Sequence, residues 1–353
     1  MQRRAFLSGA TGLWGAAALI PPNLRAGRPS RYWSTASDPS TGAVEVSELR
    51  YQGVAYSVTY PELAEDLGYL APIRLNWLGN TISGPQDIQA TVTRDVDFGG
   101  AFNGSIIRLV AAGAKIQAVV GALGSDERTW AGIYVLEDSP IRQARDLIGA
   151  KIGVNTLGAQ YEFDIATCLQ RNGASAEEIA RVVEVVLPPL NAEQALREKQ
   201  IDAVVLGGIL RDIALERGGL RLITNEYDLY GELTLASYVL RTDFIRDAPN
   251  ASRRFVEATA RAIDWVQTQP PEEVVKRFSS IISRRGRHEN DRLVRYWHSY
   301  GISHRGGLLD DSAFAGFIDW YAKNGSPAIG RLRPQDVYTN ALNPFRPHVT
   351  EGG

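Results

Sequence analysis

The stretch Asp95-Val-Asp-Phe-Gly-Gly-Ala-Phe-Asn-Gly-Ser-Ile-Ile107 decides the fold class. Residues 96–98 are typical of a strand, the glycine-containing segment 99–104 of a turn, and residues 105–112 of a helix. A strand that passes through glycines into a helix leaves unpaired backbone amides at the helix start, where an anion or a cofactor can bind. This loop has no lysine, histidine or acid at its tip. The stretch therefore predicts a binding loop of an α/β protein that lacks a catalytic group.

The same alternation continues on both sides of this stretch. Before it, the pattern predicts strands over 49–56 and 73–78 and helices over 61–68 and 85–93. After it, strands and helices alternate over 116–240, and beyond that range the chain is helical to its end. Alternation of this kind is typical of mainly parallel sheets that helices cover on both faces. The predicted fold class is α/β.

The alternation restarts after residue 130, which predicts two lobes. The first lobe is discontinuous and comprises residues 48–134 and 235–353, and the second lobe comprises residues 135–234. Strands over 130–137 and 231–240 would then cross between the lobes. Such crossing segments are the places where a hinge motion changes the backbone angles.

The N-terminus predicts export. Arg3 and Arg4 precede an uncharged run, and a small residue, Ala26, follows it, so we interpret residues 1–27 as a signal peptide that is cleaved near Ala26. The Arg-Arg-x-Phe-Leu start resembles the twin-arginine export motif, although an ordinary signal with a chance arginine pair remains the alternative. Residues 28–47 are predicted to be a flexible leader. The predicted location is the periplasm.

Composition excludes several classes of protein. The chain of 353 residues has 38 basic and 40 acidic residues, a net charge of −2, so non-specific binding of nucleic acid is not expected. Its single cysteine, Cys168, excludes a disulfide framework. Cys168 lies inside a predicted helix among apolar residues, which favours a buried side chain over a nucleophile.

Catalytic and cofactor motifs are absent from the sequence. The four histidines all lie in the final quarter of the chain, and none has the spacing of a metal site. No phosphate-binding loop with a lysine, no G-x-G-x-x-G after a strand and no G-x-S-x-G elbow occurs. We therefore predict no catalytic residue, no metal and no cofactor.

Three loops between a strand and a helix are predicted to bind a ligand. They are residues 79–83, 102–105 and 155–160, and each combines glycine with hydroxyl or amide side chains. In open α/β sheets, ligands bind beyond the carboxyl ends of the strands, next to helix N-termini. Trp77 and Tyr161 are aromatic residues near these loops that could contact an organic ligand. The predicted ligand-binding residues are Tyr56, Asn80, Thr81, Ser83, Phe102, Asn103, Gly104, Ser105, Trp130, Asn155, Thr156, Gly158, Gln160 and Gly207.

Several segments together resemble one family over about residues 50–245. The segments are Ser83–Ala90, Asp95–Gly99, Ala111–Gly113, Asp138–Ile141, Asp146–Gly149, Lys151–Val154 and Ile201–Ala203. Their order and spacing resemble substrate-binding proteins of sulfonate, taurine and nitrate ABC importers, a group that includes the thiamine-precursor binders. The resemblance implies the type II periplasmic-binding-protein fold, in which two lobes close on a ligand by hinge motion.

Two departures separate the chain from the sulfonate binders of this group. Residues 101–103 read Ala-Phe-Asn where those proteins usually have Thr-Gly-Glu or Thr-Gly-Asp, and residues 207–209 read Gly-Gly-Ile where they have a Trp-Asp-Pro type of segment. The resemblance therefore extends to the mode of binding and leaves the ligand open.

The function that these observations predict is solute binding. We expect a monomeric periplasmic protein that delivers a small anionic organic solute, sulfonate-like or carboxylate-like, to an ABC permease with its ATPase. It would contact the membrane only through the permease. One alternative is an enzyme on the same fold, because a desulfinase that uses a cysteine resembles this group, and this would require Cys168 in the cleft. A second alternative is a binding component that serves a sensor.

Overall fold

The structure is a computed structural model, and it describes residues 42–324 and 326–347. The predicted signal peptide lies outside the described residues. Of the predicted leader, residues 42–47 are described, and the Glu45 carboxylate accepts hydrogen bonds from the backbone N–H groups of Asn250 (3.2 Å) and Ala251 (2.9 Å). The end of this segment is therefore tied to the start of a long helix.

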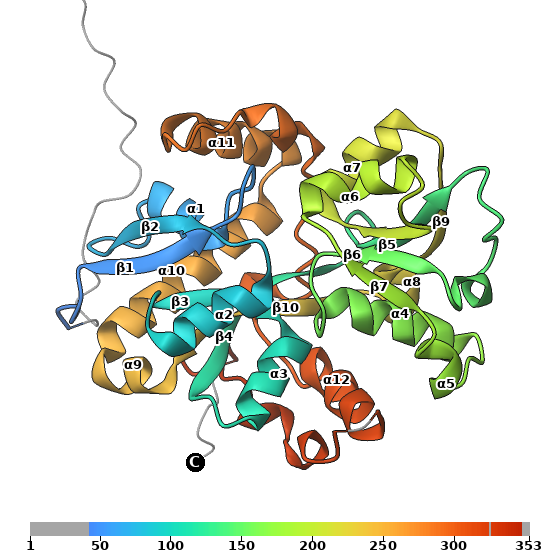
Figure 1. The fold of residues 1–353 in the computed structure, drawn as a ribbon. Coiled ribbons are helices and arrows are strands. Elements are labelled where there is room, and N and C mark those ends of the chain that lie inside the picture. The colour runs from blue at the N-terminus through green and yellow to red at the C-terminus, as the bar shows by residue number, and fades with distance from the viewer. Residues whose placement is uncertain (1–41, 325, 348–353) are drawn as a thin grey trace, which may run out of the picture. The chain divides into compact units, whose positions relative to one another are not determined.

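The first four strands of the chain, together with β10 (Leu233–Arg241), form two small sheets (Figure 1). β1 (Glu48–Gly53) pairs with β2 (Arg74–Asn80) in parallel. β3 (Phe98–Phe102) and β4 (Ile116–Ser125) both pair antiparallel with β10, which lies between them. We call these two sheets and their helices the first lobe. The chain returns to this lobe through β10, and its direction is opposite to that of both neighbours.

A five-stranded sheet forms the centre of what we call the second lobe. Its order is β7-β6-β8-β5-β9, in which β6 is parallel to β7 and β8, whereas β5 is antiparallel to β8 and β9. The bounds are β5 (Gly132–Leu136), β6 (Lys151–Val154), β7 (Val183–Val186), β8 (Ala203–Leu206) and β9 (Leu220–Asn225). The α/β class is confirmed, but the sheets are mixed rather than mainly parallel because the two crossing strands, β5 and β10, run against their neighbours. The predicted residue boundaries of the lobes stay a prediction.

Helices cover the sheets and fill the C-terminal part of the chain (Figure 1). The α-helices are α1 (Tyr60–Asp66), α2 (Gly84–Thr93), α3 (Asn103–Ala111), α4 (Gln160–Arg171), α5 (Ala176–Ile179), α6 (Pro189–Arg197), α7 (Gly208–Arg217), α8 (Glu226–Tyr230), α9 (Thr242–Asp247), α10 (Pro249–Thr268), α11 (Pro271–Arg284) and α12 (Ser312–Lys323). Short 3₁₀ helices are η1 (Ala144–Leu147), η2 (Asp291–Tyr296), η3 (Arg305–Gly307), η4 (Ile329–Arg331) and η5 (Pro334–Asp336). Within residues 42–324 and 326–347, no helix has the length and apolar character needed to cross a membrane.

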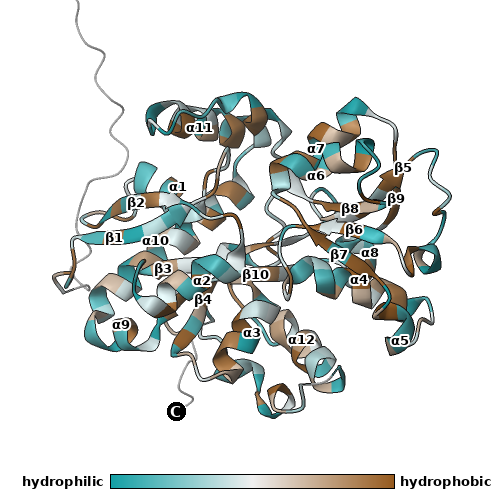
Figure 2. Ribbon diagram, viewed as in Figure 1, coloured by the Kyte–Doolittle hydropathy of each residue, from teal (hydrophilic) through white to brown (hydrophobic). Residues whose placement is uncertain are grey.

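The core follows the hydrophobic pattern of the sequence. The helix-period stripe of α10 is buried in the first lobe, where Phe255, Ala258 and Ala262 are at most 1% exposed. In the second lobe β8 consists of four buried residues, and the hydropathy colouring shows its central strands as hydrophobic (Figure 2). The Ser175 capping box that the sequence predicts at the start of α5 is present.

The stretch Asp95–Ile107 folds differently from its prediction. β3 includes Gly99 and Gly100, and α3 begins at Asn103, so the glycines lie inside the strand and not in a turn. The reason is the close packing of α2 on β3: a Cβ atom added to Gly99 would lie 2.7 Å from the carbonyl oxygen of Asp87. Likewise, a Cβ on Gly84 would lie 2.8 Å from the backbone of Ala101. These glycines allow a helix to approach a strand.

Candidate functional site

A cavity of about 660 Å³ is lined by residues of both lobes. The first lobe contributes the loop before α1, the start of α2 and parts of β3, β4 and β10. The second lobe contributes the starts of α4, α6, α7 and α8. Cavities of this size hold drug-sized ligands, so this one is large enough for an organic solute.

The structure brings many of the predicted site residues together. The predicted residues that line the cavity are Tyr56, Thr81, Ser83, Phe102, Trp130, Asn155, Gln160 and Gly207. They come from separate loops of the two lobes, as the strand-to-helix rule predicts for an open α/β sheet. Tyr161, which follows the loop 155–160 in the sequence, also lines the cavity.

Asn103 does not line the cavity. Its side chain is fully buried, and its amide group donates hydrogen bonds to the carbonyl oxygens of Thr234 and Ala313, both at 3.0 Å. Its Oδ1 atom accepts a hydrogen bond from Ser237 Oγ at 2.7 Å. Both N–H donors are thus used to tie α3 to β10 and to the start of α12. We therefore leave Asn103 out of the site, because its role is to pair buried backbone carbonyls.

The other predicted residues outside the cavity wall are Asn80, Gly104, Ser105, Thr156 and Gly158. Asn80 accepts a hydrogen bond from the indole of Trp77 at 3.1 Å. The carbonyl oxygen of Gly158 accepts one from Arg108 at 3.0 Å, which joins the second lobe to the first. Because α3 begins two residues earlier than predicted, Ser105 lies inside the helix and is buried.

Three long helices begin at the cavity without a side-chain cap. α2 begins at Gly84, α4 at Gln160 and α7 at Gly208, and at none of the three does the N-cap side chain make a capping hydrogen bond. The first N–H groups of a helix have no partner within the helix, and the helix dipole adds partial positive charge there. Gly208 has φ = 53°, a conformation that favours glycine. These helix starts can hold an acidic group of a ligand.

Aromatic side chains form much of the cavity wall. Besides the predicted Tyr56, Phe102, Trp130 and Tyr161, the wall contains Tyr60, Phe98, Tyr238, Tyr296, Trp297 and Tyr300. Sequence reasoning missed this second group because its members lie in strands, at the start of α1 or in the segment 296–300, outside the three loops with binding patterns. No local signal distinguishes them from core residues. The wall favours a ligand with a flat or apolar body.

The charged groups of the wall are carboxylates. The ionisable side chains other than tyrosine are Asp87, Asp212, Glu226 and His298, and among the described residues no lysine or arginine lines the cavity. Arg211 lies behind the wall, where its guanidinium stacks 4.3 Å from the Trp130 ring centre and pairs with Asp212 at 2.7 Å. Asp212 therefore has a cationic partner.

Asp87 has no cationic partner among residues 42–324 and 326–347. Its Oδ2 accepts a hydrogen bond from the backbone N–H of Gly100 at 2.7 Å, which joins α2 to β3. Its Oδ1 is buried and has no hydrogen-bond partner in the described part of the chain. The side chain is 6% exposed, and burial raises the pKa of this carboxyl to about 7.

Glu226 belongs to a pair of buried acids. Its Oε2 accepts a hydrogen bond from the backbone N–H of Ala131 at 2.6 Å. Burial, and then the charge of Asp164, raise the pKa of Glu226, while burial raises the pKa of Asp164 to about 7. Tyr230 donates a hydrogen bond to Asp164 at 2.8 Å. Of the side chains of Glu226, Asp164 and Tyr230, only that of Glu226 lines the cavity.

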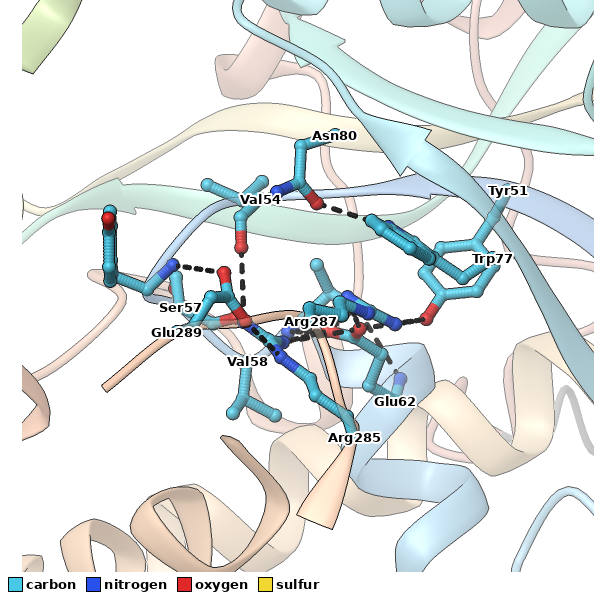
Figure 3. A network of polar contacts seen from close by, with 12 residues as sticks. Tyr51, Val54, Ser57, Val58, Glu62, Trp77, Asn80, Arg285, Arg287 and Glu289 are labelled. Carbon is cyan, nitrogen blue, oxygen red and sulfur yellow. Dashed lines mark hydrogen bonds and ion pairs between the residues drawn. The ribbon is translucent and has the colours of Figure 1, made fainter. Parts of the chain in front are cut away.

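A polar network holds the loop before α1 from behind (Figure 3). Arg285 donates to the carbonyl oxygen of Ser57 at 2.8 Å, and Arg287 pairs with Glu62 at 2.7 Å. Glu289 accepts from the backbone N–H of Tyr56 at 2.8 Å, and Tyr56 has φ = 60°, which is rare for a residue with a side chain. The network thus fixes a strained loop whose residues line the cavity.

One aromatic cluster joins the lobes beside the cavity. Phe163 of α4 packs against Phe102 of β3, with ring centres 5.8 Å apart, and against Phe317 and Trp320 of α12 at 4.6 and 5.0 Å. Trp320 also donates a hydrogen bond to Gln170 of α4 at 3.1 Å. A side chain of the second lobe therefore belongs to the core of the first.

Cys168 does not line the cavity. It is 1% exposed on α4, and burial raises the pKa of its thiol to about 11, which disfavours the reactive thiolate. The predicted buried position is confirmed. Within the described residues, no group of three or more His, Cys, Asp and Glu side chains is arranged to hold a metal ion.

Comparisons with known proteins identify relatives of the chain. The family model described as NMT1/THI5 like matches residues 65–273. No curated protein sequence matches the chain significantly.

Solved structures share the fold. A protein from Bordetella bronchiseptica has a TM-score of 0.68 at 18% identity, with 85% of this chain and 97% of that chain covered. The periplasmic aliphatic sulphonate binding protein from Escherichia coli has a TM-score of 0.60 at 19% identity, with 87% and 95% covered. The periplasmic nitrate-binding protein from Synechocystis has a TM-score of 0.64 at 13% identity, with 85% and 88% covered. The predicted periplasmic-binding-protein fold is confirmed.

Proposed function

We propose, since the chain belongs to the NMT1/THI5-like family, that it is a solute-binding protein whose ligand occupies the cavity between the two lobes. The observation that carries this proposal is the cavity itself. It is about 660 Å³, and both lobes contribute uncapped helix starts and aromatic side chains to its wall. Relatives of the same fold that bind sulphonate or nitrate support the proposal.

Binding would proceed by closure of the lobes. Backbone amides at the starts of α2, α4 and α7 would receive an acidic group of the solute, and the aromatic wall would contact its body. A solute that touches both lobes stabilises the conformation in which they are close together, because it binds that conformation more tightly than an open one. Helix amides and hydroxyl groups bind without forming a covalent bond, so the solute would leave unchanged.

We propose that the chain is exported to the periplasm as a monomer, by the twin-arginine route that its N-terminus predicts, and delivers its solute to an ABC permease with an attached ATPase. Two periplasmic proteins among the structural relatives support this location. The alternative of a cysteine enzyme finds no support in the cavity, because Cys168 is buried away from it.

A thermal-shift screen tests the proposed function. Sulfonates, carboxylates, nitrate and pyrimidines are each added in excess, and at least one class should raise the unfolding temperature. A solute at ~100 times its dissociation constant stabilises the native state by about 2.7 kcal/mol. Isothermal titration should then give one site per chain, and Cys168→Ser should bind the same solute equally well. If no class stabilises the protein, or if Cys168→Ser turns out to abolish turnover of a substrate, the proposal is wrong.

A further inference from the structure

Asp87 is an unusual wall residue because half of its carboxyl group has no partner. One oxygen joins α2 to β3 through Gly100, and an asparagine could make the same hydrogen bond. The other oxygen, Oδ1, is buried without a partner, and the residue lines the cavity. A buried carboxylate oxygen that lacks a donor destabilises the folded protein. A purely structural role therefore does not account for a carboxylate at this position.

The rest of the wall offers this carboxylate no positive charge. Described residues of the wall include no lysine or arginine, and the imidazole of His298 lies 3.7 Å from Asp212. Asp212 is paired with Arg211. Glu226 also has a buried oxygen without a partner in the described part of the chain, Oε1, but it lies beside a second buried acid, Asp164, and burial and then the charge of Asp164 raise the pKa of Glu226. Among the described residues, Asp87 is thus a wall carboxylate that has an unpartnered oxygen and no second acid beside it.

We infer that the solute carries a basic nitrogen, such as an ammonium or amidinium group, and that Oδ1 of Asp87 accepts its N–H. This inference rests on the proposed function and names a chemical class for the solute of that site. The helix starts would hold an acidic group, if the solute has one, and Asp87 would hold the basic group. Charge-assisted hydrogen bonds of this kind are stronger than neutral ones, so Asp87 would select among solutes with similar bodies.

The opposite chemistry is a protonated Asp87 that donates to an acidic group of the solute. The two chemistries predict opposite responses to pH, since burial raises the pKa of Asp87 to about 7. A basic solute should bind more tightly at pH 8 than at pH 6, because Asp87 is more often ionised there. An acidic solute that needs the protonated carboxyl should bind more weakly at pH 8.

The experiment begins by identifying the solute. The purified full chain is incubated with a small-molecule extract of yeast and washed, and the retained compounds are identified by mass spectrometry. Titration calorimetry then measures the dissociation constant of the retained compound at pH 6 and pH 8. We expect a compound with a basic nitrogen, and Asp87→Asn should weaken its binding at pH 8 by about tenfold or more, as the loss of a charged partner does.

Glu184 provides the matched control. It lies on β7 away from the cavity, burial raises the pKa of its carboxyl to about 7, and its Oε2 is also buried without a partner. Glu184→Gln should leave the dissociation constant unchanged. If Asp87→Asn does not fold, Asp87→Ser takes its place, because Glu226 also lines the cavity and its carboxyl would contribute to the pH dependence of the unmodified chain.

The outcomes separate the two proposals. If the chain retains no compound, the proposed function fails, and this inference fails with it. If it retains a compound that lacks a basic nitrogen, or binds a basic compound more weakly at pH 8 than at pH 6, solute binding stands and the role of Asp87 is refuted. Equal affinity of Asp87→Asn and the unmodified chain for a basic compound refutes it too.

Discussion

At the scale of single residues, the buried acids should make the stability of the protein depend on pH. Burial raises the pKa of Asp164 to about 7, whereas an aspartate in an unfolded chain has a pKa near ~3.9. The folded state therefore binds this proton more tightly than the unfolded state does. It follows that the free energy of unfolding is highest below the pKa that Asp164 has in the unfolded chain. It falls as the pH rises through the pKa that Asp164 has in the folded chain.

Glu226→Gln should reduce this pH dependence. Glutamine keeps an oxygen for the N–H of Ala131 and can donate to Asp164, so the mutant has one ionisable group where the native pair has two. Urea unfolding at pH 5, 6, 7 and 8 should show a smaller loss of stability in the mutant, by an amount on the order of 1–3 kcal/mol over this range. Glu232→Gln, at an exposed position, serves as the control and should follow the unmodified chain. A mutant with the same slope as the unmodified chain would contradict the role of the acid pair.

Single residues also show the reach of sequence reasoning. Thr81, Ser83, Asn155 and Gln160 could be predicted because each lies where a strand passes into a helix, and this pattern is local. Asn103 lies in the same kind of pattern, but its partners, Thr234 and Ala313, are more than a hundred residues away in the sequence. Asp87 could not be identified either, because an acid in the first turn of a helix is an ordinary helix-stabilising residue.

At the scale of elements, the distance between α2 and β3 depends on glycine. Gly99→Ala would place a Cβ 2.7 Å from both the carbonyl oxygen of Asp87 and the hydroxyl of Thr91. Because α2 would have to move outward, we expect a loss of about 1–3 kcal/mol in the free energy of unfolding, measured by urea denaturation. The start of α2 lines the cavity, so solute binding should weaken as well.

Gly316→Ala is the matched control for this prediction. Gly316 lies inside α12, and nothing lies within 4 Å of the Cβ that alanine would add. Alanine is favoured over glycine inside helices by about 0.5–1 kcal/mol, so this mutant should be more stable than the unmodified chain. If both alanine mutants change stability in the same direction, close packing does not explain the glycine at position 99.

The order of elements was easier to predict than their pairing. Apolar runs and helix caps, such as the capping box at Ser175, are local signals, and the elements they predict are present. The direction of β5 and β10 relative to their neighbours depends on how the chain crosses between lobes. No local pattern carries that information, which is why mainly parallel sheets were predicted and mixed sheets are found.

At the scale of the whole molecule, the aromatic cluster around Phe163 is one of the contacts between the lobes. Phe163→Ala should lower the free energy of unfolding by about 3–5 kcal/mol, as the loss of a buried aromatic ring does. Because its ring packs against Phe317 and Trp320 of the other lobe, the mutant should also increase the radius of gyration of the solute-free chain in X-ray scattering.

Phe278→Ala separates stability from lobe contact. Phe278 is also buried but belongs to a cluster within the first lobe. This mutant should lose a similar amount of stability without a change in radius of gyration. An identical increase in radius for both mutants would indicate partial unfolding and would refute the role assigned to Phe163.

The lone thiol at Cys168 has a consequence for the folding dynamics of the second lobe. Since its sulfur is shielded on α4 among core residues, a thiol reagent can reach it only when this part of the lobe opens. The rate at which the thiol is modified therefore measures how often this part of the lobe opens. Amide exchange gives the same information, but the thiol gives it at one defined position. The chain thus contains its own reporter of local unfolding, and no cysteine has to be introduced to read it.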